Sequence, residues 1–202
     1  MKNVLIEYLI RNKKTFIMIL ILFCIGIAIG IFSVNNSNEM QKQELNIYIE
    51  SLIEKIKNSE DIDNFKLLCL SIKENSAVIL IVWFLGCTII GGIFIYLAII
   101  YRGFCIGYTI SAMIAVLGIK QGIIISLVSM LFQNIIFLPA FFIIAENGIK
   151  LYKGIYKKCI NLKEEVVRHS IIMLITIMVS TFSSLVEVYV SMNLLIFLKE
   201  IL

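Results

Sequence analysis

Long stretches without a charged residue constrain this chain more than any other feature. Three runs of 24, 27 and 25 uncharged residues occupy positions 15–38, 75–101 and 121–145. A helix needs about 20 mostly apolar residues to cross the hydrocarbon core of a bilayer. Only 16% of the residues are charged and 60% are hydrophobic, so too few charges exist to coat a water-soluble fold. The sequence therefore predicts a membrane protein and excludes a soluble enzyme, a nucleic-acid-binding module and a disulfide scaffold.

The expected fold class is all-α: a single polytopic membrane domain over residues 1–202 with about five transmembrane helices. The third helix is the weakest, because only 17 uncharged residues separate Arg102 from Lys120. Such a helix covers about 25 Å, so this segment either crosses fully or re-enters. A cleaved signal peptide is the alternative for the first helix. The five helices are expected at about 15–34, 77–100, 103–119, 121–145 and 170–192.

Lysine and arginine gather in cytoplasmic segments of membrane proteins, so their positions predict the orientation. Residues 1–14 are basic, and residues 146–168 carry six basic and three acidic side chains. Residues 35–75 instead carry eight acidic and five basic side chains. With Arg102 in a short cytoplasmic turn, five helices place the N-terminus inside, and the acidic segment and the C-terminus outside. The basic loop 146–168 is also expected to contact anionic lipids of the bilayer.

The acidic segment 35–75 is the only part outside the membrane that is long enough to have structure of its own. Apolar residues recur in it at helical spacing, which predicts an amphipathic extracytoplasmic helix. The helix either packs on the spans or forms a docking surface for an extracytoplasmic partner. The apolar stripe consists of Leu45, Ile49, Leu52, Ile53 and Ile56, and the candidate docking residues are Glu50, Glu54 and Lys57.

The residues that catalysis or metal binding requires do not form a recognisable motif. The five cysteines contain no CxxC pair, and both aspartates, Asp61 and Asp63, lie in the outer loop. The single histidine, His169, is expected at the membrane interface. No Gly-rich phosphate-binding loop is present. We therefore expect no catalytic residues, no metal and no cofactor, and we predict that the chain is not an enzyme.

A few polar residues stand inside the apolar runs, where burial is costly. Glu187 is either a functional carboxylate deep in the membrane or a residue close to the outer interface. Gln133 and Asn134 are expected to join helices by hydrogen bonds, and Pro139 is expected to kink the fourth helix. Together with Arg102, these residues are the candidate functional positions in the membrane. They also favour an alternative function, a small permease or transporter subunit.

Two pairs of glycines have the spacing that lets membrane helices approach closely. Gly26 and Gly30 lie in the first span, and Gly103 and Gly107 lie in the third. The close contact could form within one chain or between copies, so a homo-oligomer is possible.

Several short motifs follow one another along almost the whole chain. The first motif residues follow the basic N-terminus and the first span. They are Asn75, at the end of the acidic loop, and Gly86. The later motifs are Tyr101-Arg102-Gly103-Phe104-Cys105-Ile106-Gly107-Tyr108, Gln133-Asn134-Ile135-Ile136-Phe137-Leu138-Pro139-Ala140, Glu146-Asn147-Gly148-Ile149 and Glu187. In this order they resemble the stage II sporulation protein M family, a widespread family of five-span membrane proteins.

The resemblance implies a role in sporulation, in the machinery by which the mother cell engulfs the forespore. It implies partners, the peptidoglycan-degrading stage II sporulation proteins D and P, which a member of this family would recruit or hold. The implied location is the mother-cell membrane at the sporulation septum. The expected function is therefore a non-enzymatic membrane scaffold for peptidoglycan remodelling.

Overall fold

The computed structural model describes residues 12–57, 64–88, 90–157, 161–191 and 193. These ranges contain helices and no strand, so the predicted all-α fold is confirmed. Five segments are long and apolar enough to cross a membrane, and two of them lie in one long helix, α5. The elements are α2 (Lys13–Asn35), α3 (Glu39–Lys57), α4 (Asn64–Gly86), α5 (Gly91–Lys157), α6 (Leu162–Val186) and a π-helical turn η2 (Glu187–Ser191).

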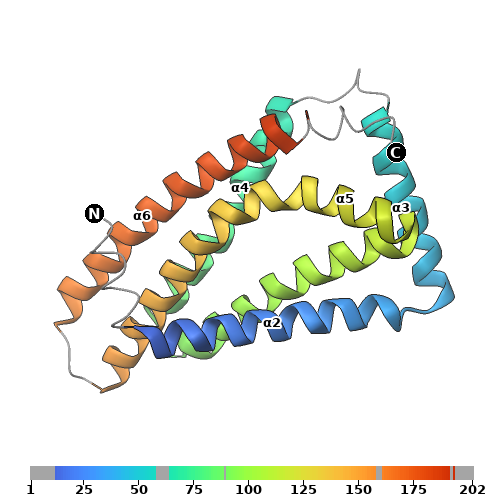
Figure 1. The fold of residues 1–202 in the computed structure, drawn as a ribbon. Helices are drawn as coiled ribbons and strands as arrows, with labels where there is room; N and C mark the ends of the chain where they lie inside the picture. The colour runs from blue at the N-terminus through green and yellow to red at the C-terminus, as the bar shows by residue number, and fades with distance from the viewer. Residues whose placement is uncertain (1–11, 58–63, 89, 158–160, 192, 194–202) are drawn as a thin grey trace.

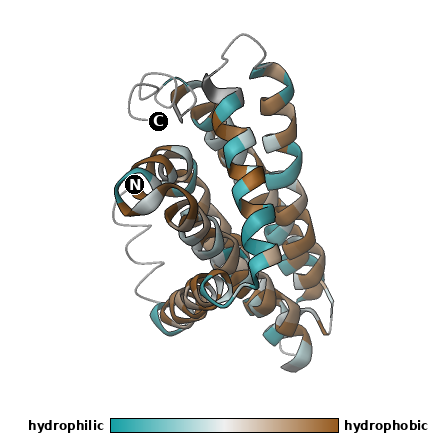
Figure 2. Cartoon of the chain, turned by 90° about the vertical axis from the view of Figure 1, so that its right-hand side faces the viewer, coloured by the Kyte–Doolittle hydropathy of each residue, from teal (hydrophilic) through white to brown (hydrophobic). Residues whose placement is uncertain are grey.

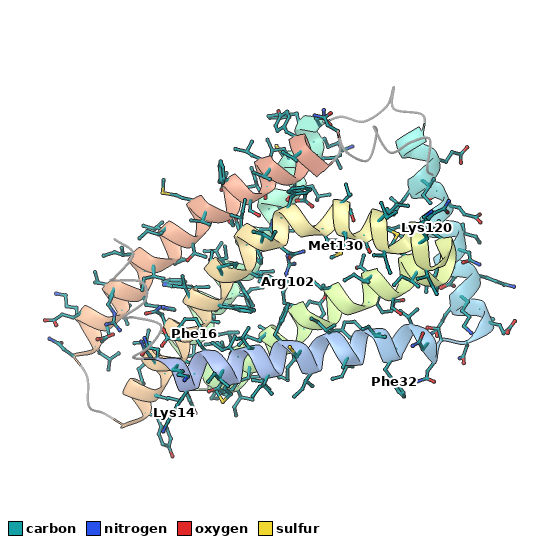
Figure 3. The ribbon with its side chains drawn as sticks, in the orientation of Figure 1. Lys14, Phe16, Phe32, Arg102, Lys120 and Met130 are labelled. Carbon is teal, nitrogen blue, oxygen red and sulfur yellow. The ribbon has the colours of Figure 1, made fainter. Side chains whose placement is uncertain are left out.

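The long helix α5 folds back on itself at a glycine. Gly118 has φ +81° and ψ 167°, and it is the residue of α5 with non-helical backbone angles. A positive φ is a conformation that glycine adopts at little cost and other residues avoid. Figure 1 shows the two halves of α5 running in opposite directions from this bend, and Lys120 lies beside it in Figure 3. Pro139 lies within the second half without interrupting the helix.

The helices form two diverging groups (Figure 1). The first half of α5 lies along α2, whereas its second half packs with α4 and α6. The two groups meet in one apolar core, where side chains of α2, α4 and α5 are buried and α6 packs against them. Its fully buried members include Ile19, Ile79, Ile95, Phe137, Phe141 and Ile149, with Ile172 and Ile177 of α6 packed against them.

Apolar side chains also cover the outside of the spans, as a bilayer requires. Ile21 and Phe32 of α2 and Met178 of α6 are among the exposed large hydrophobic residues. Phe32 points away from the other helices in Figure 3. These faces would be a liability in water, but they suit contact with lipid.

The second and third spans differ from their expected positions. The second was expected at 77–100, but α4 begins at Asn64 and ends at Gly86. The chain turns at 87–90, where the Thr88 hydroxyl donates to the Leu85 carbonyl over 2.8 Å. The whole stretch 75–101 is uncharged, so charge placement could not locate a turn inside it.

This difference moves Arg102 from a loop into a membrane span. The expected cytoplasmic turn at this position does not exist, because α5 is helical from Gly91 through Arg102 to the bend. Arg102 follows Gly91 by eleven residues, or about 16 Å along the helix. The residue is therefore an intramembrane arginine, and the assignment of Arg102 to a cytoplasmic turn is wrong.

Helix α3 runs across the end of the bundle where the two groups diverge, transverse to α2 (Figure 1). Its inner face is apolar, and Ile49 is 3% exposed. Ile49 packs with Val34 of α2 and Ala112 of α5 in a second small core, which Leu45 and Ile53 extend. In Figure 2, hydrophilic and hydrophobic residues alternate along α3. The expected amphipathic helix is thus present and anchored on the spans.

Candidate functional site

Several polar residues of the spans gather around one cavity between α4, α5 and η2. Its volume is about 260 Å³. Two candidate charged residues, Arg102 and Glu187, both line this cavity, although 85 residues separate them in sequence. The other polar side chains around it are Ser71, Glu74, Asn75 and Gln133.

Glu187 reaches the cavity from an irregular part of its helix. Regular α-helix ends at Val186, and the next five residues, Glu187–Ser191, form a π-helical turn. Such turns are rare and occur frequently at functional sites, because the extra residue per turn redirects side chains. The carboxylate oxygen Oε2 accepts a hydrogen bond from the Ser71 hydroxyl of α4. The bond joins α4 to η2 across the bundle.

The Ser71 hydroxyl that bonds Glu187 also belongs to a small hydrogen-bond network between α4 and α6. Asn75 is buried, and its amide donates to Ser71 Oγ over 3.3 Å and to Ser184 Oγ over 3.1 Å. Ser71 and Ser184 lie 2.9 Å apart, oxygen to oxygen. Ser183 donates to the backbone carbonyl of Gln133 over 2.8 Å, which ties α6 to α5 as well. Three helices are thus held together at the floor of the cavity.

Arg102 enters the cavity from the first half of α5 and contacts the second half. Its guanidinium carbon lies 4.6 Å from the centre of the Phe137 ring, an arrangement that favours a cation. Its Nη2 atom is 3.5 Å from Asn134 Oδ1, and the Asn134 amide donates to the Met130 carbonyl over 2.8 Å. Figure 3 shows Arg102 between the two halves of α5, with Met130 nearby.

Two other residues that the sequence proposed as functional, Gln133 and Asn134, also belong to the site. Gln133 lines the cavity and accepts a hydrogen bond at its backbone carbonyl, and Asn134 contacts Arg102. Pro139 lies five residues beyond Asn134, and the cavity lining does not include it. Ser71 and Asn75 were not among the candidate site residues, because the acidic loop was taken to extend to Asn75. Their spacing, with Ser71 and Asn75 one helical turn apart on the same face, is the signal that could have found them.

A contact at the end of the bundle opposite α3 shows where along the helices the cavity lies. His169, Gly86 and Gly148 meet there: a Cβ added to Gly86 would lie 2.7 Å from His169 Nε2 and 2.9 Å from Gly148 Cα. Ser184 follows His169 by fifteen residues, or about 22 Å of helix. The cavity therefore lies in the half of the bundle that is closer to α3.

His169 is buried between the helices. It is 2% exposed, and its imidazole interacts with the backbone of Trp83. The two glycines beside it leave space for the imidazole ring. Near this contact, Glu146 is fully buried and forms an ion pair with Lys150 over 2.7 Å.

The four glycines of the two GxxxG pairs lie against one another within the chain. A Cβ on Gly26 would clash with the Ile100 carbonyl oxygen, and a Cβ on Gly107 would clash with that of Ile27. Gly30 and Gly103 make equally close backbone contacts with α5 and α2. The pairs therefore join α2 to the first half of α5.

The candidate docking residues on α3 are exposed where they are described. Glu50 and Glu54 are both exposed, whereas Ile49 is buried. The side chain of Lys57, at the last position of α3, lies outside the described residues.

No group of three or more His, Cys, Asp or Glu side chains in the described ranges could hold a metal ion. The cysteines within these ranges, Cys24, Cys69, Cys87 and Cys105, are free.

One comparison with known proteins gives a match. The sequence model of the family described as "Stage II sporulation protein M" matches residues 19–192. The matched range includes every residue that lines the cavity and all of α3. No curated protein and no solved structure matches the chain.

Proposed function

Because the chain belongs to the stage II sporulation protein M family and is a multi-pass membrane protein, we propose that it is a non-enzymatic scaffold in sporulation. In this role it holds peptidoglycan-degrading partners, the stage II sporulation proteins D and P, at the septal membrane during engulfment. The hydrolases supply the wall chemistry, and this chain keeps them at the membrane where the wall must be removed.

The observation that carries the proposal is the exposed face of α3. This helix lies at one end of the spans and is held by an apolar inner face, so its outer face is presented in a constant orientation. Ile47 and Tyr48 are 68% and 62% exposed, and the acidic Glu50 and Glu54 lie on the same face as Ile47, one and two helical turns away. Aromatic and apolar side chains ringed by charges are the composition expected of a protein-binding patch.

Charge reversal on this face tests the scaffold proposal. We expect the double variant Glu50→Lys, Glu54→Lys to capture about tenfold less hydrolase, because reversed charges oppose a complementary partner surface. The measurement is the amount of proteins D and P that co-purifies with the tagged chain from sporulating membranes.

The control is Lys163→Glu, which reverses an exposed charge in the first turn of α6, at the other end of the bundle. This variant should capture both hydrolases at the normal level. Equal capture by the α3 double variant, at equal abundance in the membrane, would show that α3 is not the docking surface.

The second candidate function is a permease subunit, which the polar cavity around Arg102 and Glu187 favours. A proton or ion pathway would need the carboxylate to change its charge. Glu187→Gln keeps the shape of the side chain and removes that capacity. Loss of engulfment with normal hydrolase capture in this variant would favour the permease; complete engulfment would favour the scaffold.

A further inference from the structure

Two opposite charges face the same membrane cavity without pairing. Arg102 and Glu187 both line it and interact electrostatically, but no ion pair within 4.0 Å joins them in the described part of the chain. Two such groups in an apolar span would pay a large desolvation cost if they stayed apart in a dry cavity. The arrangement therefore indicates that something polar occupies the space between them.

Each charged group has hydrogen-bonding capacity left over. Arg102 Nε is buried and has no partner among the described residues, while Nη2 makes one long bond to Asn134. Glu187 uses Oε2 for the bond from Ser71, and its Oε1 accepts none from the described residues. The guanidinium can therefore donate to an anion, and the carboxylate can accept from a cation.

A second carboxylate makes the two sides of the cavity unequal. Glu74 lines the same cavity, is exposed, and interacts electrostatically with both Glu187 and Arg102. One side thus presents a guanidinium resting on an aromatic ring, and the other presents two carboxylates. A ligand with an anionic and a cationic group matches this separation, whereas a simple anion would meet repulsion on one side.

The size and lining of the cavity suit a lipid headgroup. Its volume of about 260 Å³ is several times the ~30 Å³ that one water molecule occupies. Apolar side chains complete the wall, and two of them on α4, Leu67 and Leu70, are 37% and 51% exposed. Acyl chains can lie along this apolar surface while the headgroup reaches the charged residues, which lie in the α3 half of the bundle.

We propose that this cavity binds a phosphate–ammonium zwitterion, the headgroup chemistry of an ethanolamine phospholipid. The phosphate accepts hydrogen bonds from Arg102, whose planar fork suits phosphate oxygens. The ammonium lies between Glu187 and Glu74. The bound lipid joins α4, α5 and η2, and it is independent of partner docking on α3.

The test uses the full-length chain purified in detergent and reconstituted in nanodiscs with equal amounts of ethanolamine and glycerol phospholipids. We expect the retained lipid, counted by native mass spectrometry, to be enriched at least about tenfold in the ethanolamine lipid. Glu187→Gln should lower the enrichment about tenfold, or about 1.4 kcal/mol, because it removes a charge that faces the ammonium of the ethanolamine lipid. Arg102→Gln should instead lower the total amount of retained phospholipid about tenfold, because both lipids carry the phosphate that Arg102 binds. Arg102→Lys should recover only part of that amount, since lysine lacks the fork.

Lys120→Gln is the matched control, because it removes an exposed charge at the bend of α5, outside the cavity lining. It should keep the full enrichment. Glu74→Gln, at the exposed edge of the cavity, gives the same readout if the two buried substitutions prevent folding, and it should lower the enrichment.

Competition with free phosphoethanolamine shows whether the cavity recognises the headgroup alone or the whole lipid. Free phosphoethanolamine that displaces the lipid would assign recognition to the headgroup alone, whereas displacement only by intact ethanolamine lipid would assign it to headgroup and chains together. Equal retention of both lipids by the unaltered chain, unchanged enrichment in folded Glu187→Gln, or unchanged total phospholipid in folded Arg102→Gln would overturn the proposal and leave water as the occupant.

Discussion

Asn75 shows how one polar side chain can join two membrane helices. It lies in the middle of α4, is 3% exposed, and donates to hydroxyls on both α4 and α6. Hydrogen bonds between membrane helices contribute about 0.6–2 kcal/mol each, because an apolar surrounding offers few other partners. Loss of this side chain should therefore loosen the floor of the cavity.

A double-mutant cycle tests the contact. We expect Asn75→Ala and Ser184→Ala to show a coupling energy of about 0.6–2 kcal/mol, since both remove the same bond. The measurement is the free energy of unfolding in mixed micelles. Ser180→Ala is the control partner: Ser180 is fully buried, but among the described residues its hydroxyl bonds the carbonyl of Ile177 in its own helix. Coupling to Ser180 as large as coupling to Ser184 would contradict a specific bond.

Gly26 allows α2 to approach α5, so a methyl group there should be costly. In Gly26→Ala the new Cβ meets the Ile100 carbonyl, and the two backbones must separate. We expect a loss of about 1–3 kcal/mol, typical of overpacking, measured by thermal unfolding in detergent. Ile29→Ala, on the half-exposed outer face of α2, should change stability by less than about 0.5 kcal/mol. Equal effects of the two changes would refute close packing at Gly26.

Arg102 marks where reasoning from single residues failed. A charge at the edge of an apolar run was taken as the end of a span, because most charges in membrane proteins lie there. Here the guanidinium is accommodated inside by Phe137 and Asn134, which come from a span more than 30 residues further along the chain. No local pattern around Arg102 contains that information.

At the scale of elements, α3 is the helix that the sequence described best. Its apolar stripe predicted an amphipathic helix, and the structure shows three members of that stripe, Leu45, Ile49 and Ile53, packed on α2 and α5. The adjacent boundary was less accurate, because the apolar stretch after Asn75 belongs to two helices with an uncharged turn between them.

The anchoring of α3 can be tested with two isoleucines that lie two residues apart. Ile49→Ala should detach α3, because it removes a side chain that is buried in the second core and costs about 2–3 kcal/mol. We expect faster hydrogen exchange in residues 39–54 with little change in α4 and α6. Ile47→Ala, 68% exposed on the same helix, should leave exchange unchanged. Uniform protection in both variants would mean that other contacts hold α3.

At the scale of the whole molecule, the orientation in the membrane stays a prediction, in which an odd number of crossings puts the two termini on opposite sides. We propose that the N-terminus is cytoplasmic and that α3 faces the wall. Because Arg102 lies in a span, it is no longer a loop charge that indicates the orientation. The orientation is supported by the basic segments 1–14 and 146–168 and by the acidic segment 35–75. The folded-back α5 keeps the number of crossings at five.

Cysteine labelling tests this orientation. In a chain whose five native cysteines are replaced by alanine, Glu54→Cys should react with a membrane-impermeant maleimide in intact cells. Asn161→Cys, in the turn before α6, should react only after the membrane is permeabilised. The reverse pattern would invert the topology and place α3 in the cytoplasm.

The sequence by itself determined that this is a helical membrane protein with five crossings, an amphipathic helix outside them and glycine faces for close packing. These properties follow from the hydropathy and spacing of neighbouring residues, and local chemistry is enough to read them. Only the tertiary structure decided where α4 ends, that Arg102 lies inside the membrane, and that it shares a cavity with Glu187, Ser71 and Asn75. Those facts depend on contacts between helices distant in sequence, since a polar group is accommodated in an apolar medium only by partners that the fold brings to it.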